Sequence, residues 1–331
     1  MPPLEPSHTA AVTPRVNPEQ LLRRLEWTVI RRLDGQLQGD YRTLLRGFGI
    51  DLADLREYQA HDDVRYIDWN VTARLQTPHV REFLEDREVS AWFLLDLSGS
   101  LNFGSRGVRK QELSAEFVGI LARLLTRHGN RVGAILYAGL PVKGRDCEVI
   151  PARVGRRQVL HVLDRMLSGS ARTAPAARAA GATDLAVLLG QAQTAIKRRS
   201  VIFVVSDFIS VPGWDKSLAL LSRRHEVIAV RLYDPLELEL PDLGFVTMQD
   251  AESGEQLFVD THDRRLRKRF AESAARREAA LRDALATAGI DCLELATDDR
   301  LADALLRFIR LRKRRSQLSA GAISARSAVS L

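Results

Sequence analysis

Three oxygen-bearing side chains lie together in residues 96–100, which read DLSGS: Asp96, Ser98 and Ser100. They follow an apolar run, residues 91–97, that is typical of a buried central strand of a parallel sheet. Open α/β sheets bind ligands at the carboxyl ends of their strands. A carboxylate and two hydroxyls are ligands that suit a hard cation such as Mg²⁺. Asp and Ser are common residues, so this spacing alone is not specific.

Two further polar residues are expected at the same edge. Thr183 precedes a predicted helix in GATDLAVLL, and Asp207 ends the apolar strand VIFVVSD. If these strands are neighbours, five side chains converge on one cation, Mg²⁺ or else Mn²⁺ or Ca²⁺: Asp96, Ser98, Ser100, Thr183 and Asp207. With few full charges around it, the ion can accept one more carboxylate from outside. The alternative is that each residue serves its own loop as a turn residue or a helix cap.

The elements that would position these residues alternate along the chain. Apolar patterning predicts strands at 91–97, 131–138, 146–150, 201–207, 225–231 and 290–294. It predicts helices at 18–33, 108–128, 155–167, 184–197, 214–223, 262–287 and 299–313. Residues 243–260 read as a hairpin with a turn at Ser253–Gly254. The alternation predicts a doubly wound, mostly parallel sheet of the α/β class.

Four regions follow from this pattern. Residues 1–16, rich in Pro, Ala and Thr, are predicted to be disordered. Residues 17–90 form a helix and an irregular β-containing segment that packs on the main domain. The main domain covers 91–313 and includes the hairpin, and 314–331 form a flexible tail.

The irregular segment contains a cluster of mixed charges around a tryptophan: Asp62, Asp63, Arg65, Asp68, Trp69 and Arg74. Such groups can form a buried salt-bridge network that pins the segment to the domain. Trp and Arg are also common interface anchors, so a partner-binding surface is the alternative. Both interpretations apply equally to Asp234, Pro235 and Glu237.

Composition limits the classes of protein that fit. The 331 residues carry a net charge of +7, which permits acidic partners, nucleic acid or anionic surfaces without indicating any of them. The two cysteines, Cys147 and Cys292, lack the spacing of a zinc site or a disulfide framework, which favours reduced thiols. The first residues lack the apolar core of a signal peptide, and no apolar run is long enough to span a membrane. We therefore expect a cytoplasmic protein.

The order DLSGS, ATDL and VVSD on an alternating sheet resembles the metal-ion-dependent adhesion site of von Willebrand factor A domains. That resemblance implies that Asp96, Ser98 and Ser100 form a first motif, Thr183 a second and Asp207 a third. The third motif often reads Asp-Gly in that fold. Here Phe208 follows the aspartate, which is expected to change the loop.

The flanking segments narrow the resemblance. Residues 57–74 and 225–244 are similar to the domain of unknown function 58 family of bacterial proteins, over roughly residues 40–260. The Gly that usually precedes the paired aspartates is His61 here. The resemblance implies an intracellular A-type domain, often encoded beside MoxR-type AAA+ ATPases. It further implies that the protein partners such an ATPase in chaperone-like work or complex maturation.

Three functions remain open. The first is a metal-dependent protein-interaction module without catalytic residues or a small-molecule substrate. The second is a metal-assisted hydrolase of phosphoesters or peptides, but the turn lacks a second aspartate, a neighbouring His, a P-loop and a nucleophile elbow. The third is a binder of nucleic acid or anionic surfaces through the basic run 307–317. No aromatic residues interleave that run, so a solvated helix end is favoured.

Overall fold

A six-stranded sheet forms the centre of the molecule, with strand order β10-β7-β6-β3-β4-β5. The computed structural model describes residues 17–30, 33, 54–59, 64, 67, 69, 72–73, 76–82, 90–105, 107–142, 145–170, 183–250 and 254–328. The strands are β3 (Ser90–Asp96), β4 (Arg131–Val142), β5 (Arg145–Arg153), β6 (Val201–Ser206), β7 (Glu226–Tyr233) and β10 (Asp291–Ala296). All neighbours pair in parallel except β5, which runs antiparallel to β4. The predicted mostly parallel α/β class is confirmed.

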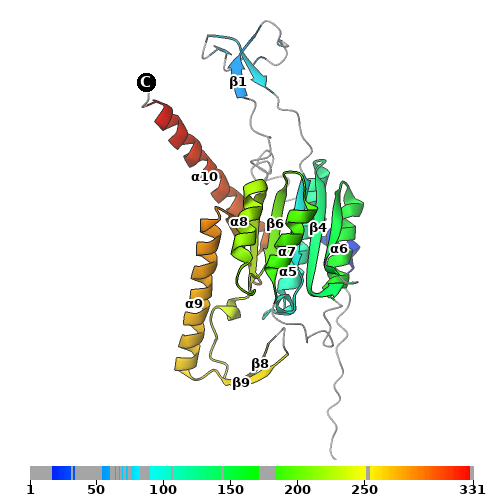
Figure 1. Cartoon of the computed structure of the whole chain (residues 1–331), viewed down its shortest axis with the longest axis vertical. Helices are drawn as coiled ribbons and strands as arrows, with labels where there is room; N and C mark the ends of the chain where they lie inside the picture. Colours follow the sequence, from blue (N-terminus) through cyan, green and yellow to red (C-terminus); the bar gives the residue numbers. More distant parts are fainter. Residues whose placement is uncertain are drawn as a thin grey trace, which may run out of the picture.

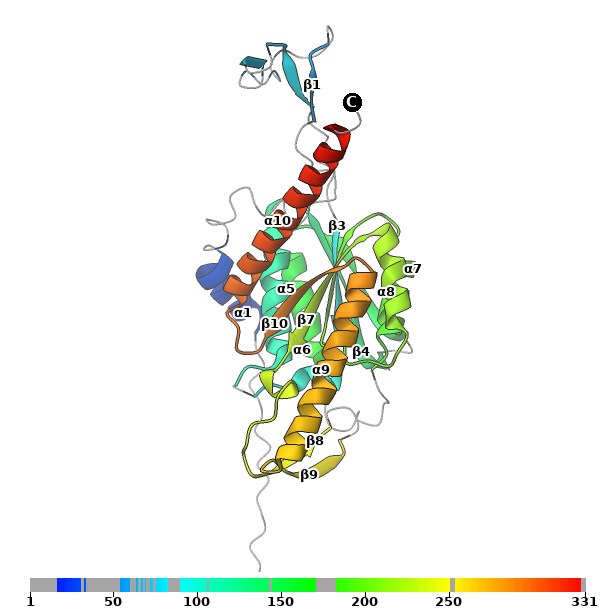
Figure 2. The same ribbon diagram turned by 90° about the vertical axis from the view of Figure 1, so that its left-hand side faces the viewer.

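Helices cover both faces of the sheet (Figures 1 and 2). One face is covered by α1 (Pro18–Leu25), α5 (Lys110–Arg127), α6 (Arg156–Ser170) and α10 (Leu301–Ala328). The other face is covered by α7 (Leu185–Ala195), α8 (Trp214–Arg224) and α9 (Arg264–Thr287). Successive residues of a strand point to opposite faces. Phe93 therefore packs in the first layer and Leu94 in the second, which is why the central strands read as continuous apolar runs.

Three aromatic rings join the strands and the helix that lead to the candidate site. Phe93 of β3 stacks on Phe203 of β6, with ring centroids 5.2 Å apart. Phe117 of α5 meets both rings edge-on, at 6.4 Å and 6.2 Å. Such pairs contribute about 0.5–1.5 kcal/mol each beyond the area that they bury. They fix β3, β6 and α5 relative to one another at the layer below the site.

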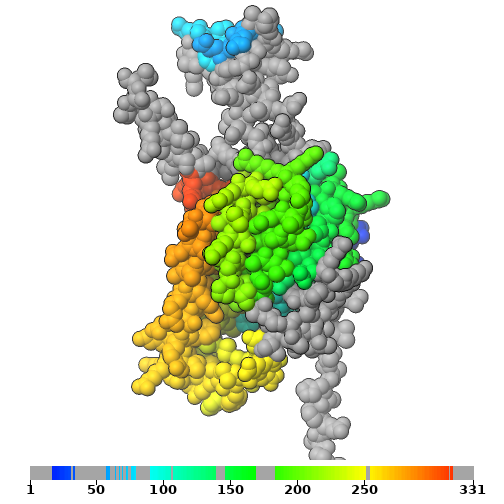
Figure 3. Space-filling model, viewed as in Figure 1, coloured from blue at the N-terminus to red at the C-terminus, as the bar shows by residue number. Residues whose placement is uncertain are grey.

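Two small hairpins project from opposite ends of the molecule (Figures 1 and 2). Antiparallel β1 (Asp54–Glu57) and β2 (His79–Glu82) lie beyond the edge where β3 begins. The second hairpin is β8 (Phe245–Gln249) with β9 (Gln256–Asp260), and it confirms the predicted hairpin. The rings of Phe245 and Phe258 stack 5.4 Å apart, and both side chains are exposed. Figure 3 shows the hairpin in yellow below the orange helix α9.

The structure tests the prediction for the last helix but not the one for the first residues of the chain. The predicted disorder of residues 1–16 falls outside the described residues. Helix α10 continues to Ala328, so the expected helix end at 313 is wrong, while the flexible tail over 314–331 stays a prediction. The added residues are mostly Ala, Ser, Arg, Gln and Leu without a proline, so nothing in them forces the helix to stop.

Candidate metal centre

Asp96 lies at the last position of β3 and is completely buried. Its Oδ1 accepts a hydrogen bond from the backbone N–H of Ser98 at 2.9 Å. Its Oδ2 accepts one from the Ser206 hydroxyl at 2.7 Å. Ser206 ends the neighbouring strand β6, so the two strand ends hold this carboxylate in one orientation.

Ser98 and Ser100 place their hydroxyl groups side by side. Ser98 directly precedes the 3₁₀ helix η3 (Gly99–Asn102), which turns the chain at the carboxyl end of β3. Their Oγ atoms are 3.1 Å apart. Adjacent ligands of an octahedral Mg²⁺ at about 2.1 Å from the ion lie about 3 Å from each other. The spacing of these two hydroxyls therefore fits two neighbouring positions around such an ion.

Asp207 directly follows β6 and is also buried. Its Oδ1 accepts the N–H of Ile209 at 3.0 Å, so the carboxylate shapes its own loop. The next residue, Phe208, has a φ of +59°. This φ lies in the left-handed region that glycine favours. Phe208 therefore adopts the backbone conformation expected of a glycine at this position, and the expected change in the loop conformation is not seen. Burial of its ring against Trp214, with centroids 5.4 Å apart, offsets the strain.

Thr183 is buried just before α7, in the loop that faces the β6 loop. Its carbonyl oxygen accepts hydrogen bonds from the Ser210 hydroxyl at 3.0 Å and from the N–H of Val211 at 2.9 Å. The helix cap is the adjacent Asp184, whose side chain accepts from Ala186. Asp96, Ser98, Ser100 and Asp207 thus lie at the ends of β3 and β6, and Thr183 is bonded through its carbonyl to the chain that follows β6.

Tyr137 connects the Thr183 loop to the strand end that carries Asp96. Tyr137 lies in β4 and is paired with Asp96 of the neighbouring strand β3. Its phenol oxygen accepts a hydrogen bond from the N–H of Asp184 at 3.2 Å. Thr183 and Asp184 are therefore held at the same carboxyl edge as the Asp96 turn.

The Asp96 carboxylate lies in an unfavourable electrostatic environment. Burial, reinforced by the negative charge of Asp207, raises the pKa of Asp96 to about 6, although hydrogen bonds from Ser206 and Ser98 act in the opposite direction. Hydrogen bonds alone do not compensate for the lost hydration. A cation next to this carboxylate would stabilise its ionised form.

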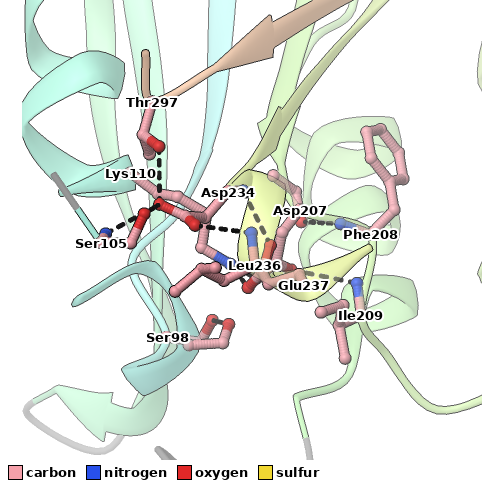
Figure 4. Close-up of polar contacts among 12 residues, drawn as sticks. Ser98, Ser105, Lys110, Asp207, Phe208, Ile209, Asp234, Leu236, Glu237 and Thr297 are labelled. Carbon is pink, nitrogen blue, oxygen red and sulfur yellow. Dashed lines mark hydrogen bonds and ion pairs between the residues drawn. The ribbon is translucent and has the colours of Figure 1, made fainter. Parts of the chain in front are cut away.

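Lys110 and Ser206 are two members of the cluster that the sequence did not single out. The side chain of Lys110, at the start of α5, is completely buried, and Figure 4 shows its acidic neighbours. Its Nζ donates to Oδ2 of Asp207 at 2.7 Å and to Oε1 of Glu237 at 2.6 Å. Burial acts to lower the pKa of Lys110, but the two carboxylates outweigh burial and the pKa is raised above its ordinary value. A lysine at a helix start was the available signal, since cations are disfavoured there.

A second buried network adjoins Lys110. Asp234 follows β7, and its Oδ2 accepts hydrogen bonds from the N–H and hydroxyl of Ser105, at 2.8 and 2.9 Å, and from the Thr297 hydroxyl at 2.6 Å. Asp234 and Glu237 also form a capping box around η5 (Pro235–Glu237). These bonds favour the structural interpretation of Asp234 and Glu237, because they tie together the loops after β3, β7 and β10.

The charged cluster before β3 is placed only in part. Trp69 is 69% exposed, so its indole is not the centre of a buried network. Asp62, Asp63, Arg65, Asp68 and Arg74 lie outside the described residues. Their two interpretations stay predictions.

The donor set of the candidate site consists of hydroxyls and carboxylates. Within the described ranges, there is no group of three or more His, Cys, Asp or Glu side chains that could hold a metal ion. The candidate set includes only two acidic residues, Asp96 and Asp207, with Ser98, Ser100 and Thr183 as hydroxyl donors. Such a set is suited to a hard, oxygen-preferring cation and not to a soft one.

Similarity to known proteins covers most of the chain. Residues 54–280 match a family described as "Protein of unknown function DUF58". "Uncharacterized protein Rv1480" of Mycobacterium tuberculosis is 38% identical over 296 residues, which cover 88% of this chain and 89% of that protein. "Uncharacterized protein MAV169" of Mycobacterium avium is 35% identical over 166 residues, which cover 50% of this chain and 94% of that protein.

Among solved structures, the conserved hypothetical protein BatB from Bacteroides thetaiotaomicron is similar at a TM-score of 0.40 and 14% identity. That likeness covers 68% of this chain and 99% of BatB. It is too distant to indicate an activity. In the part of the chain that the structure describes, no helix combines the length and apolar character needed to cross a membrane.

Proposed function

The chain belongs to the family described as Protein of unknown function DUF58, and we propose that it is a metal-dependent protein-interaction module. Its cation, Mg²⁺ or a related divalent ion, would be held at the carboxyl edge of the sheet by Asp96, Ser98, Ser100, Thr183 and Asp207. The motif order resembles that of von Willebrand factor A domains, and the finer assignment of the fold to that class is part of the proposal.

One observation carries this proposal: two hydroxyls at ligand spacing lie beside a buried carboxylate. The Oγ atoms of Ser98 and Ser100 are 3.1 Å apart, and the N–H of Ser98 is bonded to Asp96. A bound ion would supply a Lewis-acidic position to which an oxygen ligand from another molecule can bind. Ser206 and the Ser98 N–H keep the Asp96 carboxylate oriented, so little side-chain movement is needed to receive the ion.

The expected partner is a protein that offers an Asp or Glu side chain. A carboxylate is the oxygen ligand that best complements a hard cation with an open position. The family resemblance adds the expectation that the partner is a MoxR-type AAA+ ATPase, with chaperone-like work on other proteins as the role of the pair. Contact through the metal and through the loops around it would together set the specificity of binding.

Capture of partners from a lysate of the source cells tests the proposal. Immobilised wild-type protein should retain a protein in Mg²⁺ and release it when a chelator is added. The Asp96→Ala variant should retain none of it, because the carboxylate that holds the ion is gone. Mass spectrometry of the eluate identifies the partner and shows whether it is an AAA+ ATPase.

A matched control separates loss of the site from loss of an acidic group in general. Asp283 lies exposed on α9, so Asp283→Ala removes the same group far from the candidate site. This variant should capture the partner like the wild type, and circular dichroism should show all three proteins folded. Mg²⁺-dependent capture by the folded Asp96→Ala variant would rule out the proposed function.

A further inference from the structure

Lys110 holds an unusual position for a charged side chain. It occupies the first position of α5, where the positive end of the helix dipole disfavours a cation. Its side chain is also completely removed from solvent. Two short ion pairs, to Asp207 at 2.7 Å and to Glu237 at 2.6 Å, outweigh both effects. The ammonium is therefore a fixed part of the sheet edge.

The ion pair with Lys110 is made by the carboxylate oxygen of Asp207 that does not bond to the backbone of its own loop. Oδ2 accepts from the Lys110 ammonium, and Oδ1 accepts from the N–H of Ile209. Asp96 also has both carboxylate oxygens bonded, but its donors, the Ser206 hydroxyl and the Ser98 N–H, are neutral. The donor to Oδ2 of Asp207 is a cation, which repels a second cation at the same oxygen. Direct coordination of an ion through the Lys110-facing oxygen would require the ammonium to withdraw.

Glu237 prevents such a withdrawal. Its Oε1 accepts from Lys110 while its Oε2 accepts from the N–H of Asp234 at 3.0 Å. Asp234 is itself buried and bonded to Ser105 and Thr297. The ammonium is anchored from two sides, and its second anchor belongs to a network that joins three loops (Figure 4).

We propose that Lys110 is a positioning residue that withholds the Asp207 carboxylate from direct contact with the bound cation. This inference rests on the proposed function and specifies how the site keeps room for a partner. Asp96 is then the one carboxylate of the candidate set whose charge no ammonium compensates, and it lies beside the neutral hydroxyls of Ser98 and Ser100. A divalent ion so held retains positive charge and an open position. Both favour the arrival of a carboxylate from the partner.

The test uses Mn²⁺ as the probe, because its bound water molecules can be counted by electron–nuclear double resonance and water-proton relaxation. In the wild-type background, Asp207→Ala should leave the number of waters on bound Mn²⁺ unchanged, since Asp207 would contribute to the site only through an intervening water. A gain of one water in Asp207→Ala would show direct coordination and overturn the proposal.

The converse variant frees Asp207 from the ammonium. Lys110→Met/Glu237→Gln removes the lysine and one carboxylate together, so the remaining groups keep their balance of charge. Asp207 should then bind the ion directly, with about tenfold or greater tightening of the Mn²⁺ dissociation constant and one water fewer on the ion. Adding Asp207→Asn should abolish the gain. Lys216→Met, on the exposed surface of α8, is the control and should match the wild type.

The outcomes separate the two proposals. If the wild type binds Mn²⁺ and the folded Lys110→Met/Glu237→Gln variant shows the same affinity and hydration, the role of Lys110 is wrong and the metal site stands. If that variant binds more weakly, the role of Lys110 is likewise wrong. If the wild type does not bind Mn²⁺, the proposed function fails and the inference fails with it. The Asp207→Ala measurement decides the question even if the lysine variant does not fold.

Discussion

Single side chains at the ends of β3 and β6 carry most of the chemistry inferred for this protein. Asp96 is oriented by Ser206 and by the turn at Ser98, while Asp207 is oriented by Lys110 and by its own loop. The two carboxylates are thus held by different means. Neutral donors surround Asp96 and leave its charge uncompensated, whereas an ammonium compensates the charge of Asp207.

Phe208 allows a prediction about strain beside the site. Phe208→Gly removes a buried ring, which costs about 3–5 kcal/mol for Phe→Ala in protein cores. It also relieves the left-handed backbone strain, worth about 1–2 kcal/mol. We expect the free energy of unfolding, measured by urea denaturation, to fall by about 2 kcal/mol. A more stable Phe208→Gly protein would mean that the contact with Trp214 contributes little.

Among the elements, the loop between η3 and α5 is the tightest part of the site. A Cβ atom added to Gly104 would lie 2.0 Å from the carbonyl oxygen of Val108, so only glycine fits there. The close approach brings Ser105 to Asp234 and starts α5 at Lys110. The geometry of this one turn therefore positions both Ser105, which bonds Asp234, and Lys110, which bonds Asp207 and Glu237.

The junction of α8 and β7, at the opposite edge of the sheet, gives a pH dependence. His225 is buried there, and neither ring nitrogen has a hydrogen-bond partner among the described residues. Burial, with Arg224 and Arg199 nearby, lowers the pKa of His225 below its ordinary value of 6.5. The unfolded chain therefore binds the proton more readily, so this stabilising contribution is full above pH 6.5 and is lost as the pH falls below it.

The corresponding prediction is that His225→Leu removes part of the acid sensitivity. The free energy of unfolding of the wild type should decline as the pH is lowered from 7 to 5. The variant should decline less, because it has no imidazole to protonate. Urea denaturation at each pH measures the difference between the two proteins. Equal slopes would show that folding does not change the pKa of His225, which would contradict the effect ascribed to its burial.

At the scale of the whole molecule, the order of the elements could be predicted because the sheet is buried on both faces. The segment VIFVVS has no polar residue until its end, and it forms β6 at Val201–Ser206. The shared location of Asp96 and Asp207 could be predicted because parallel strand ends share one edge, and their role in holding a metal stays a prediction. The partners of Lys110 could not be predicted, since Asp207 and Glu237 lie 97 and 127 residues further along the chain. The end of α10 was missed because no helix-stopping residue marks it.

Long-range contacts also hold the two long helices α9 and α10, whose sequences are rich in Arg. Arg231 of β7 bonds Glu278 of α9 at 2.5 Å, and its guanidinium lies over the ring of Tyr233. Arg312 of α10 contacts Glu226 and bonds Asp291 at 3.1 Å, at the start of β7 and β10. Both helices are thus attached to the β7 side of the sheet, α10 at the edge where β7 and β10 begin.

Equilibrium binding of Mn²⁺, measured by isothermal titration calorimetry, tests the central claim most directly. The wild-type chain should bind a single Mn²⁺, and Ser98→Ala/Ser100→Ala should weaken binding by about tenfold or more, which corresponds to about 1.4 kcal/mol. Ser273→Ala, on the exposed face of α9, should leave binding unchanged. Absence of saturable Mn²⁺ binding by the wild type, or equal binding by the folded double variant, would contradict a cation site at the end of β3.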